Sequence, residues 1–209
     1  MGSSLMDKVK QTAKARQILD EFAAAFHNLR LDEDFSSVVN LVVKQRNHGK
    51  IITTGMGKAG IAMRKFASTL CSLGFSAAHL HPGEASHGDL GLITKDDILF
   101  VASTSGKTRE IIEIVELARN IDVKKVVGIT SHPDSPIRDM ADYIIDMGMI
   151  NEAGYLGLAP TTSILIMLGI TDCIALVAAE HANITKEDYS KYHHGGYLGS
   201  VARGDREIF

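Results

Sequence analysis

The chain has 209 residues, of which 45% are hydrophobic and 22% are charged, and its formal net charge is −3. This length suffices for one domain with a sizeable core, and the charge offers no general attraction for nucleic acid or an anionic membrane. We therefore expect a small-molecule ligand. The N-terminus has no apolar signal core, and polar residues interrupt the longest apolar run, so we predict a cytoplasmic protein without a membrane anchor.

Only two cysteines occur, Cys71 and Cys173, and both fall in apolar stretches typical of helices. We expect buried, reduced thiols at these positions rather than a disulfide or a nucleophile. Such use of cysteine suits the reducing environment of the cytosol.

Two amphipathic helices open the chain, and apolar side chains at helical spacing place them over residues 7–29 and 35–42. After these helices, the spacing of the apolar residues changes. Short apolar or β-branched runs predict five strands, over residues 51–54, 75–80, 98–102, 125–130 and 143–147. Helices are predicted between most of these strands and after the last one, over residues 58–73, 107–121, 135–140 and 161–182.

The alternation of strands and helices predicts a parallel sheet that is covered on both faces. We expect an α/β fold, a three-layer αβα sandwich with a five-stranded parallel sheet and an N-terminal helical extension. Residues 1–209 would form a single domain. Its parts would be N-terminal helices at 1–48, an αβα core at 49–185, and a C-terminal segment with a partly ordered tail at 186–209.

The segment STSGKTRE (103–110) follows the strand predicted at 98–102. Ligands of open α/β sheets bind beyond the carboxyl ends of the strands. The glycine permits a tight turn, the next helix presents free N–H groups, and the hydroxyls of Ser103, Ser105 and Thr108 add donors around one anion. Helix capping by a single serine is the plainer alternative. Three hydroxyls and a glycine within so short a segment favour a phosphate site.

The segment GMGKAG (55–60) follows the first predicted strand and fits the G-x-G-x-x-G pattern of dinucleotide-binding turns. Such a site also needs an acidic residue about 20 positions further on, and histidines stand there instead. This disfavours a nucleotide cofactor. We expect Gly55 and Gly57 to let the backbone approach a ligand closely, with Lys58 projecting from the start of the helix.

The segment HLHPGEASHGDLG (79–91) gathers imidazoles and carboxylates, namely His79, His81, Glu84, His87 and Asp89. Such a cluster could bind zinc, although it lacks the thiolates and regular spacing of structural zinc sites. Several histidines beside carboxylates in one strand-end loop favour acid–base chemistry, because imidazole titrates near neutral pH.

Together with LAPTTS (158–163) and HHGGYLG (193–199), these segments resemble the sugar isomerase (SIS) domain of D-arabinose 5-phosphate isomerases. The resemblance runs from residue 51 to residue 199. It implies a flavodoxin-like sandwich that assembles into dimers or tetramers, with sites near subunit interfaces. It also implies interconversion of D-ribulose 5-phosphate and D-arabinose 5-phosphate through an enediol, for the synthesis of Kdo in lipopolysaccharide or capsule.

By motif position, the resemblance implies four catalytic residues, which are Lys58, His87, Glu110 and His193. It implies substrate contacts from the phosphate loop, the glycine turn and the histidine-rich loop, at Gly55, Gly57, Ser103, Thr104, Ser105, Gly106, Thr108, His81 and Glu84. Glu110 would stay ionised in the first turn of a helix and orient other groups. One of the two histidines would transfer the proton, while Lys58 stabilises the enediolate oxygen.

No cofactor and no catalytic metal are expected, because an enediol mechanism can run on side chains alone. A metal held by His81, His87 and His193 would be inhibitory or adventitious. The chain departs from the family pattern at Ala59, where serine is usual, and at His194, where proline is usual. It also stops without the paired CBS modules of many members, so we expect no regulation through such modules.

Two alternatives stay open. One is a phosphosugar-sensing module that binds without turnover, as SIS domains do in some transcription regulators. The other is an isomerase of a different phosphosugar, a hexulose 6-phosphate or a phosphoheptose. The first 48 residues show no basic recognition helix, and HGDLG is specific to the arabinose 5-phosphate branch, so both are disfavoured.

Overall fold

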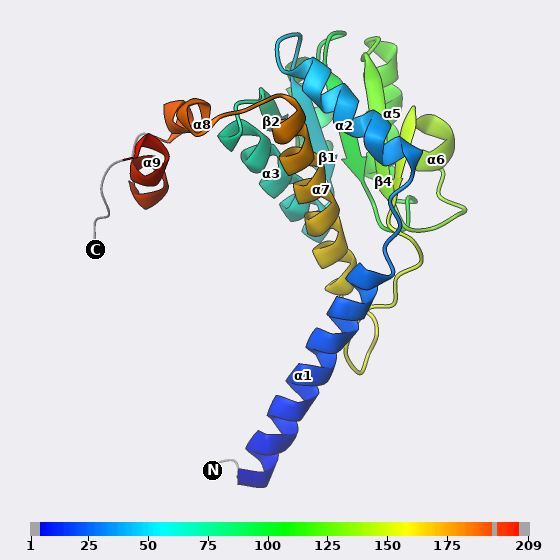
Figure 1. The fold of residues 1–209 in the computed structure, drawn as a ribbon. Coiled ribbons are helices and arrows are strands. Elements are labelled where there is room, and N and C mark those ends of the chain that lie inside the picture. Colours follow the sequence, from blue (N-terminus) through cyan, green and yellow to red (C-terminus); the bar gives the residue numbers. More distant parts are fainter. Residues whose placement is uncertain (1–4, 194–195, 205–209) are drawn as a thin grey trace.

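The computed structural model describes residues 5–193 and 196–204, and its centre is a five-stranded parallel sheet (Figure 1). The strands are β1 (Ile51–Gly55), β2 (Ala77–His79), β3 (Ile98–Ala102), β4 (Lys125–Thr130) and β5 (Tyr143–Asp146). They lie in the order β2-β1-β3-β4-β5, and each neighbouring pair is parallel. The predicted αβα sandwich is thus confirmed.

Helices cover both faces of the sheet. One face packs against α2 (Glu33–Gln45), α3 (Gly57–Ser72) and α7 (Thr162–His181). The other packs against α5 (Arg109–Asn120), with the short helices α4 (Pro82–Ala85), η1 (Asp89–Leu92) and α6 (Ile137–Met140). The remaining helices lie at the periphery in Figure 1, namely α1 (Leu5–His27), α8 (Lys186–Tyr192) and α9 (Gly196–Arg203).

Strand β3 shows why the sequence specifies this layering. Its five residues are all buried, and they alternate between the two cores. Ile98 and Phe100 face α3 and α7, and the Phe100 ring meets Phe66 of α3 edge-on with centroids 5.2 Å apart. Leu99 and Val101 face the opposite side. A strand buried on both faces needs a continuous apolar run, which is what the sequence shows.

Helix α7 is apolar on every side and closes the first core. By length and composition alone it could cross a membrane, but 56% of its most apolar stretch is buried inside the protein. It packs against α2, α3 and α1. We therefore describe it as a core helix of the sandwich.

The prediction of buried thiols is wrong. Cys71 and Cys173 are free and lie in α3 and α7, as expected, but both are exposed. In α3 the buried stripe includes Phe66 and Leu70, and Cys71 lies about 100° around the helix from Leu70. Apolar flanking sequence did not reveal this, because a helix at the edge of a core buries only one stripe.

The structure also differs from the sequence-based predictions near the end of the chain and at the edge of the sheet. Strand β2 covers only three residues, since Phe75 and Ser76 precede it without regular structure and Leu80 already follows it. The tail predicted as partly ordered begins at residue 193 and contains one described helix, α9, while α8 lies just before it; residues 194–195 and 205–209 of the tail lie outside the described residues. Helix α8 begins with a capping box between Thr185 and Asp188, a start signal that its short length had obscured.

A buried carboxylate fixes the turn before β3. Asp97 is fully buried and accepts hydrogen bonds from the Lys50 amide at 2.6 Å and the Thr94 amide at 2.8 Å, while the Lys50 ammonium lies 2.8 Å away. Burial alone would raise the pKa of Asp97. The donors from Lys50 and Thr94 outweigh burial and lower that pKa below its ordinary value.

Because its pKa is lower in the folded than in the unfolded state, Asp97 stabilises the fold above the unfolded pKa, and this stability is lost as the pH falls through the folded value. We predict that Asp97→Asn lowers the free energy of unfolding at pH 7 by about 1.5–3 kcal/mol. The variant should also lose part of the acid sensitivity seen below about pH 4. Urea unfolding across this pH range checks both expectations, and parallel curves for variant and parent would contradict them.

Candidate active site

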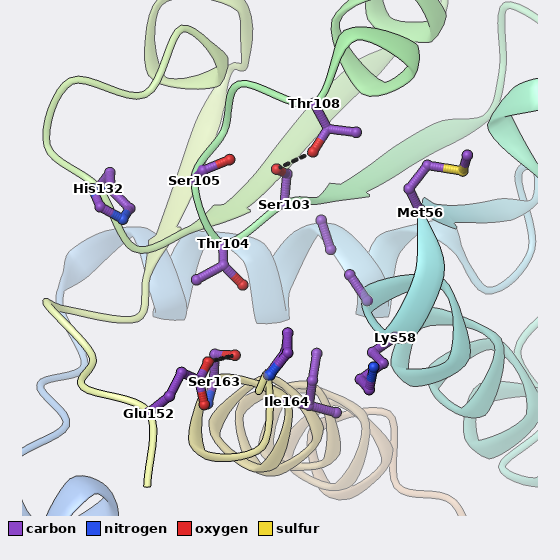
Figure 2. Close-up of a pocket in the computed structure, with 13 residues that line it drawn as sticks. Met56, Lys58, Ser103, Thr104, Ser105, Thr108, His132, Glu152, Ser163 and Ile164 are labelled. Atoms are coloured by element: carbon purple, nitrogen blue, oxygen red, sulfur yellow. Dashed lines mark hydrogen bonds between the residues drawn. The ribbon is translucent and has the colours of Figure 1, made fainter. Parts of the chain in front are cut away.

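A cleft of about 340 Å³ lies at the carboxyl edge of the sheet, where the chain leaves β1 and β3 (Figure 2). The connections from these two neighbouring strands run in opposite directions, toward β2 on one side and β4 on the other. A crevice therefore opens between them, as in other open α/β sheets. Its walls come from the turn after β1, the loop after β3, the loop after β4 and the start of α7.

The loop after β3 forms one wall and is organised by its own hydroxyls. Ser103 Oγ lies 2.8 Å from Thr108 Oγ1 and accepts from the Gly106 amide at 3.1 Å. Ser105 Oγ accepts from the Lys107 amide at 3.2 Å. In the described chain the Thr108 side chain does not cap α5, so the first amides of this helix can serve an anion. Ser103, Thr104, Ser105 and Thr108 all line the cleft.

Gly106 does not line the cleft, and its role is steric. Its φ is +66°, a conformation that favours glycine. A Cβ placed on it would lie 1.6 Å from the hydroxyl oxygen of buried Ser135 in the loop after β4. That second loop is tied to the first, because the carbonyl oxygen of Thr104 accepts from the Ser131 amide at 3.0 Å. The phosphate loop is thus packed from behind without any space to spare.

The glycine turn after β1 places Lys58 against the opposite wall. A Cβ on Gly60 would lie 2.4 Å from the Gly55 carbonyl oxygen, so helix α3 can approach the strand only without a side chain there. Gly57 begins α3 with a φ of +57°. Lys58 follows and lines the cleft across from the phosphate loop (Figure 2). Gly55 and Gly57 themselves do not line the cleft, and they shape it through the backbone.

The sequence analysis missed Glu152, which closes one side of the cleft. It lies in the loop after β5, and its carboxylate accepts from the Thr161 amide at 2.8 Å and from the hydroxyl and amide of Ser163. These donors belong to the start of α7, whose dipole favours a negative charge. The sequence did offer one signal for Glu152, because it is an acidic residue that follows a strand at the carboxyl edge of the sheet.

Other lining residues were not singled out from the sequence either. His132, in the loop after β4, lies at the side of the cleft where Figure 2 also shows Glu152 and Ser163. The rest of the lining is mainly apolar, from Met56, Ala59, Ala102, Pro160 and Ile164. A mostly apolar floor with a few polar groups that converge is typical of small-molecule sites.

Several predicted residues do not line this cleft. Glu110 lies half-buried in the first turn of α5, and Glu84 and His87 lie in and after α4. His81 lines a separate hollow of about 750 Å³ at the outer edge of β2, together with Arg64, His79 and Asp89 among others. The histidine-rich loop and the phosphate loop therefore occupy neighbouring but distinct places at one edge of the sheet.

His79 is held as a neutral ring in that second hollow. Thr53 Oγ1 donates its proton to the Met63 carbonyl oxygen at 2.8 Å, so it accepts from His79 Nδ1 at 3.3 Å. Burial, with the nearby charges of Arg64 and His81, lowers the pKa of His79. The Nε2 atom consequently keeps a free lone pair at neutral pH.

His193 lies far from the cleft within one chain. It ends α8, and α8 packs at the C-terminal end of α3, where a Cβ on Gly74 would lie 2.8 Å from the Tyr192 ring. Lys58 is at the opposite end of α3, a helix of 16 residues that spans about 24 Å. The imidazole stacks on the Tyr189 ring at 3.8 Å.

The contact with Tyr189 also fixes the tautomer of His193. Its Nδ1 lies 3.0 Å from the Tyr189 carbonyl oxygen, which can only accept, so the neutral ring carries its proton on Nδ1. The Nε2 lone pair is then available to take a proton. Such an orientation of imidazole by a backbone carbonyl is common among histidines that act as bases or ligands.

The family is decided by a match over the sheet and its helices. A family model described as "SIS domain" matches residues 45–177. The chain belongs to the SIS domain family. The matched range contains the whole sheet and most of α7, and it leaves out α8, α9 and His193.

Several relatives of this SIS domain are named as sugar-phosphate isomerases. Arabinose 5-phosphate isomerase KpsF of Escherichia coli is 37% identical over 200 residues, which cover 94% of this chain and 60% of that protein. The chain thus spans about 60% of the length of the curated relatives it matches.

Solved structures resemble the SIS domain along its length. A candidate phosphosugar isomerase involved in capsule formation from Bacteroides fragilis is 40% identical, with a TM-score of 0.86 and coverage of 90% of this chain and 99% of that one. The protein c3406 of Escherichia coli CFT073, solved in complex with arabinose 5-phosphate, is 27% identical, with a TM-score of 0.82 and coverage of 91% and 100%.

Within residues 5–193 and 196–204 of the SIS domain, no three side chains from His, Cys, Asp and Glu come together in an arrangement that would hold a metal ion. The histidines predicted as an adventitious metal set lie on different elements: His81 caps α4, His87 follows it, and His193 ends α8. What the cleft does present is hydroxyls, helix amides and a lysine, which are ligands for a phosphate.

The packing of Gly106 against Ser135 yields a test of the loop geometry. We predict that Gly106→Ala lowers the free energy of unfolding by about 1–3 kcal/mol, because the backbone is strained and Ser135 must move. Binding of inorganic phosphate should weaken in parallel. Chemical denaturation and titration calorimetry measure the two effects. Gly91→Ala is the matched control, since its Cβ would meet no atom within 4 Å; equal stability of the two variants would refute the packing.

Proposed function

We propose that this chain is an aldose–ketose isomerase that interconverts D-ribulose 5-phosphate and D-arabinose 5-phosphate. The observation that carries the proposal is the cleft between β1 and β3, where Lys58 and Glu152 face a loop suited to phosphate. Its volume of about 340 Å³ is enough for a pentose phosphate. The names of KpsF and of the c3406 complex support the same substrate.

The product would enter Kdo synthesis, and the capsule role named for the Bacteroides fragilis protein supports that place in metabolism. The partner would be a small phosphosugar in the cytoplasm, without a cofactor. Among sugar phosphates, the specificity would come from the distance between the phosphate loop and the groups at the other end of the cleft.

The chemistry requires one proton to move between two carbons. After the ring opens, a base removes the proton from C2 of arabinose 5-phosphate, and the electrons of that bond form the double bond of a cis-enediolate. The proton is then delivered to C1, while the proton of the C2 hydroxyl passes to the C1 oxygen, so that the C2 oxygen becomes the carbonyl and C1 the CH2OH group of ribulose 5-phosphate. Lys58 would stabilise the negative enediolate oxygen through its ammonium group.

Glu152 would act as a fixed acceptor for sugar hydroxyls. Its oxygens already accept from Thr161 and Ser163, so the carboxylate cannot turn away from the cleft. Holding the open-chain sugar in one conformation keeps the reacting C–H bond in line with its base, which contributes to the rate as much as the proton transfer itself does.

We infer that His193 is the base and that a second copy of the chain supplies it. Its Nε2 lone pair is free, but α3 separates it from Lys58 of its own chain. A neighbouring copy that presents α8 to the cleft would complete the site. His87, Glu110, His81 and Glu84 stay predictions of the resemblance, and they could act only if assembly brings them to a cleft.

Turnover can be followed by proton NMR with ribulose 5-phosphate in deuterated buffer. We expect arabinose 5-phosphate with deuterium at C2, because the base exchanges its proton with solvent. Glu152→Gln should lower kcat by about ten- to a hundredfold, the equivalent of one charged hydrogen bond. Glu116→Gln, an exposed change on α5, is the matched control.

Each other outcome of this assay has a definite meaning. Saturable binding of the sugar phosphate without turnover would favour the sensing module. Product without deuterium would mean that the transferred hydrogen does not exchange with solvent, as in a hydride shift or in transfer by a base that is shielded from water. Turnover of a hexulose 6-phosphate or a phosphoheptose instead would identify a different phosphosugar isomerase on the same site.

Mixing of two inactive variants tests the shared site. Lys58→Ala and His193→Ala should each abolish turnover, but chains of the two kinds assembled together contain sites with Lys58 from one copy and His193 from the other. Random pairing in a two-fold dimer should restore about a quarter of the parent activity. No recovery, with mixed assemblies verified by mass spectrometry, would mean that His193 serves its own chain or none.

A further inference from the structure

The phosphate loop brings no cation of its own into the cleft. Its segment contains Lys107 and Arg109, but both line a separate hollow of about 350 Å³, beside Glu113 and Glu116 of α5. The hydroxyl side chains of the loop that do line the cleft are neutral donors. A phosphate monoester carries a charge of about −1.5 to −2 at pH 7. A cation from another element would therefore complete the site.

The charges that line the cleft leave one side chain to supply this cation. Among the residues that the structure describes, three side chains that can carry a charge line the cleft, namely Lys58, His132 and Glu152. Lys58 lies on the wall opposite the phosphate loop, and the charge of Glu152 offsets its own (Figure 2). The side chains of the cleft consequently have a net positive charge only when His132 is protonated.

Two contacts hold His132 beside the phosphate loop. On one side of it, the Ser131 amide donates to the Thr104 carbonyl oxygen at 3.0 Å. On the other side, Ser135 packs so closely on Gly106 that a Cβ there would lie 1.6 Å from the serine hydroxyl oxygen. His132 lies between these two contacts in the sequence. The loop after β4 therefore runs along the phosphate loop where it carries the imidazole.

The backbone of His132 is also fixed from the side of β5. Its carbonyl oxygen accepts from Arg138 Nε at 2.8 Å and from the Ser135 amide at 3.2 Å. Arg138 is held in turn by Asp146, at 2.8 Å. Pro133 follows and restricts the backbone further. The exposed imidazole is thus the part of this residue that is left to bind a ligand.

Figure 2 shows His132 and Ser105 at the same end of the cleft, away from Lys58. An imidazolium makes charge-assisted hydrogen bonds to phosphate, and histidine can adopt this form near neutral pH. We propose that His132 binds the phosphate group of the substrate and thereby sets the preference for phosphorylated sugars. Lys58 is then left for the reacting carbons. The inference rests on the proposed function in one respect, because it takes the ligand of the cleft to be a phosphosugar.

Substitutions at this position separate charge from shape. His132→Ala removes the group, His132→Gln keeps a neutral donor, and His132→Lys keeps a positive charge. The fold should tolerate all three, because the hydrogen bonds that hold the residue use its carbonyl oxygen. His48→Ala is the matched control, since His48 is also exposed and lies in the turn before β1, at the opposite edge of the sheet. Titration calorimetry measures binding of inorganic phosphate at about pH 6.5, where about half of free imidazole is protonated.

We expect His132→Ala to weaken phosphate binding about ten- to a hundredfold, the loss of one charged hydrogen bond. His132→Gln should be weakened too, whereas His132→Lys should stay within about threefold of the parent. In the NMR assay, KM for arabinose 5-phosphate should rise by the same factor in His132→Ala with kcat unchanged, because the phosphate is bound alike in the ground and transition states.

Three results overturn the inference. The first is phosphate binding by His132→Ala as tight as that of the parent and of His48→Ala. The second is a loss that His132→Lys does not restore, since the charge would then not be the cause. The third is a fall in kcat with KM unchanged, which would place His132 in the chemical step.

The inference and the proposed function fail in different ways. Phosphate binding that depends on His132, in a protein without turnover, would reject the isomerase and keep the phosphate contact. Turnover with a KM that is the same in His132→Ala and the parent would keep the isomerase and reject the contact. A folded parent that binds neither inorganic phosphate nor arabinose 5-phosphate would overturn both.

Discussion

All of the proposed chemistry depends on the divergence of the chain at the carboxyl ends of β1 and β3. Because the sheet order reverses there, the starts of α3 and α5 open toward a common space instead of covering it. The start of α7 reaches the same space through Ser163. Three helix N-termini thus line one cleft: the starts of α3 and α5 would supply positive charge to the anion proposed there, whereas the amides at the start of α7 hold the Glu152 carboxylate.

Local sequence patterns were enough to predict the layered fold and the loop that forms one wall of the cleft. Strand β3 could be predicted because burial on both faces demands an unbroken apolar run, and the phosphate loop because its hydroxyls and Gly106 stand together in sequence. Glu152 was missed because its partners in α7 are about ten residues away along a loop of irregular shape. The exposure of Cys71 and the fold of α9 likewise depend on packing that a periodic pattern does not record.

The position of His193 in the fold could not be predicted from the sequence, for a different reason. Motif position gives its identity, but the local sequence gives only a short helix with a capping box and a stacked tyrosine. Those contacts orient the imidazole completely within α8, independently of the cleft. A group that is oriented before it meets its substrate suits a site assembled from separate copies, because docking then adds position alone and costs little further side-chain entropy.

The contact between Gly106 and Ser135 makes the two loops a single mechanical unit. Neither loop can change its path without the other, since the glycine rests on the serine side chain and the Thr104 carbonyl binds the loop after β4. Anyone who wishes to redesign the anion preference of this scaffold has therefore to treat both loops together, and a larger residue at one position calls for a smaller one at the other. A change at Gly106 alone is expected to destabilise the fold, whereas libraries that vary both loops in pairs can keep the fold while the cleft takes a new shape.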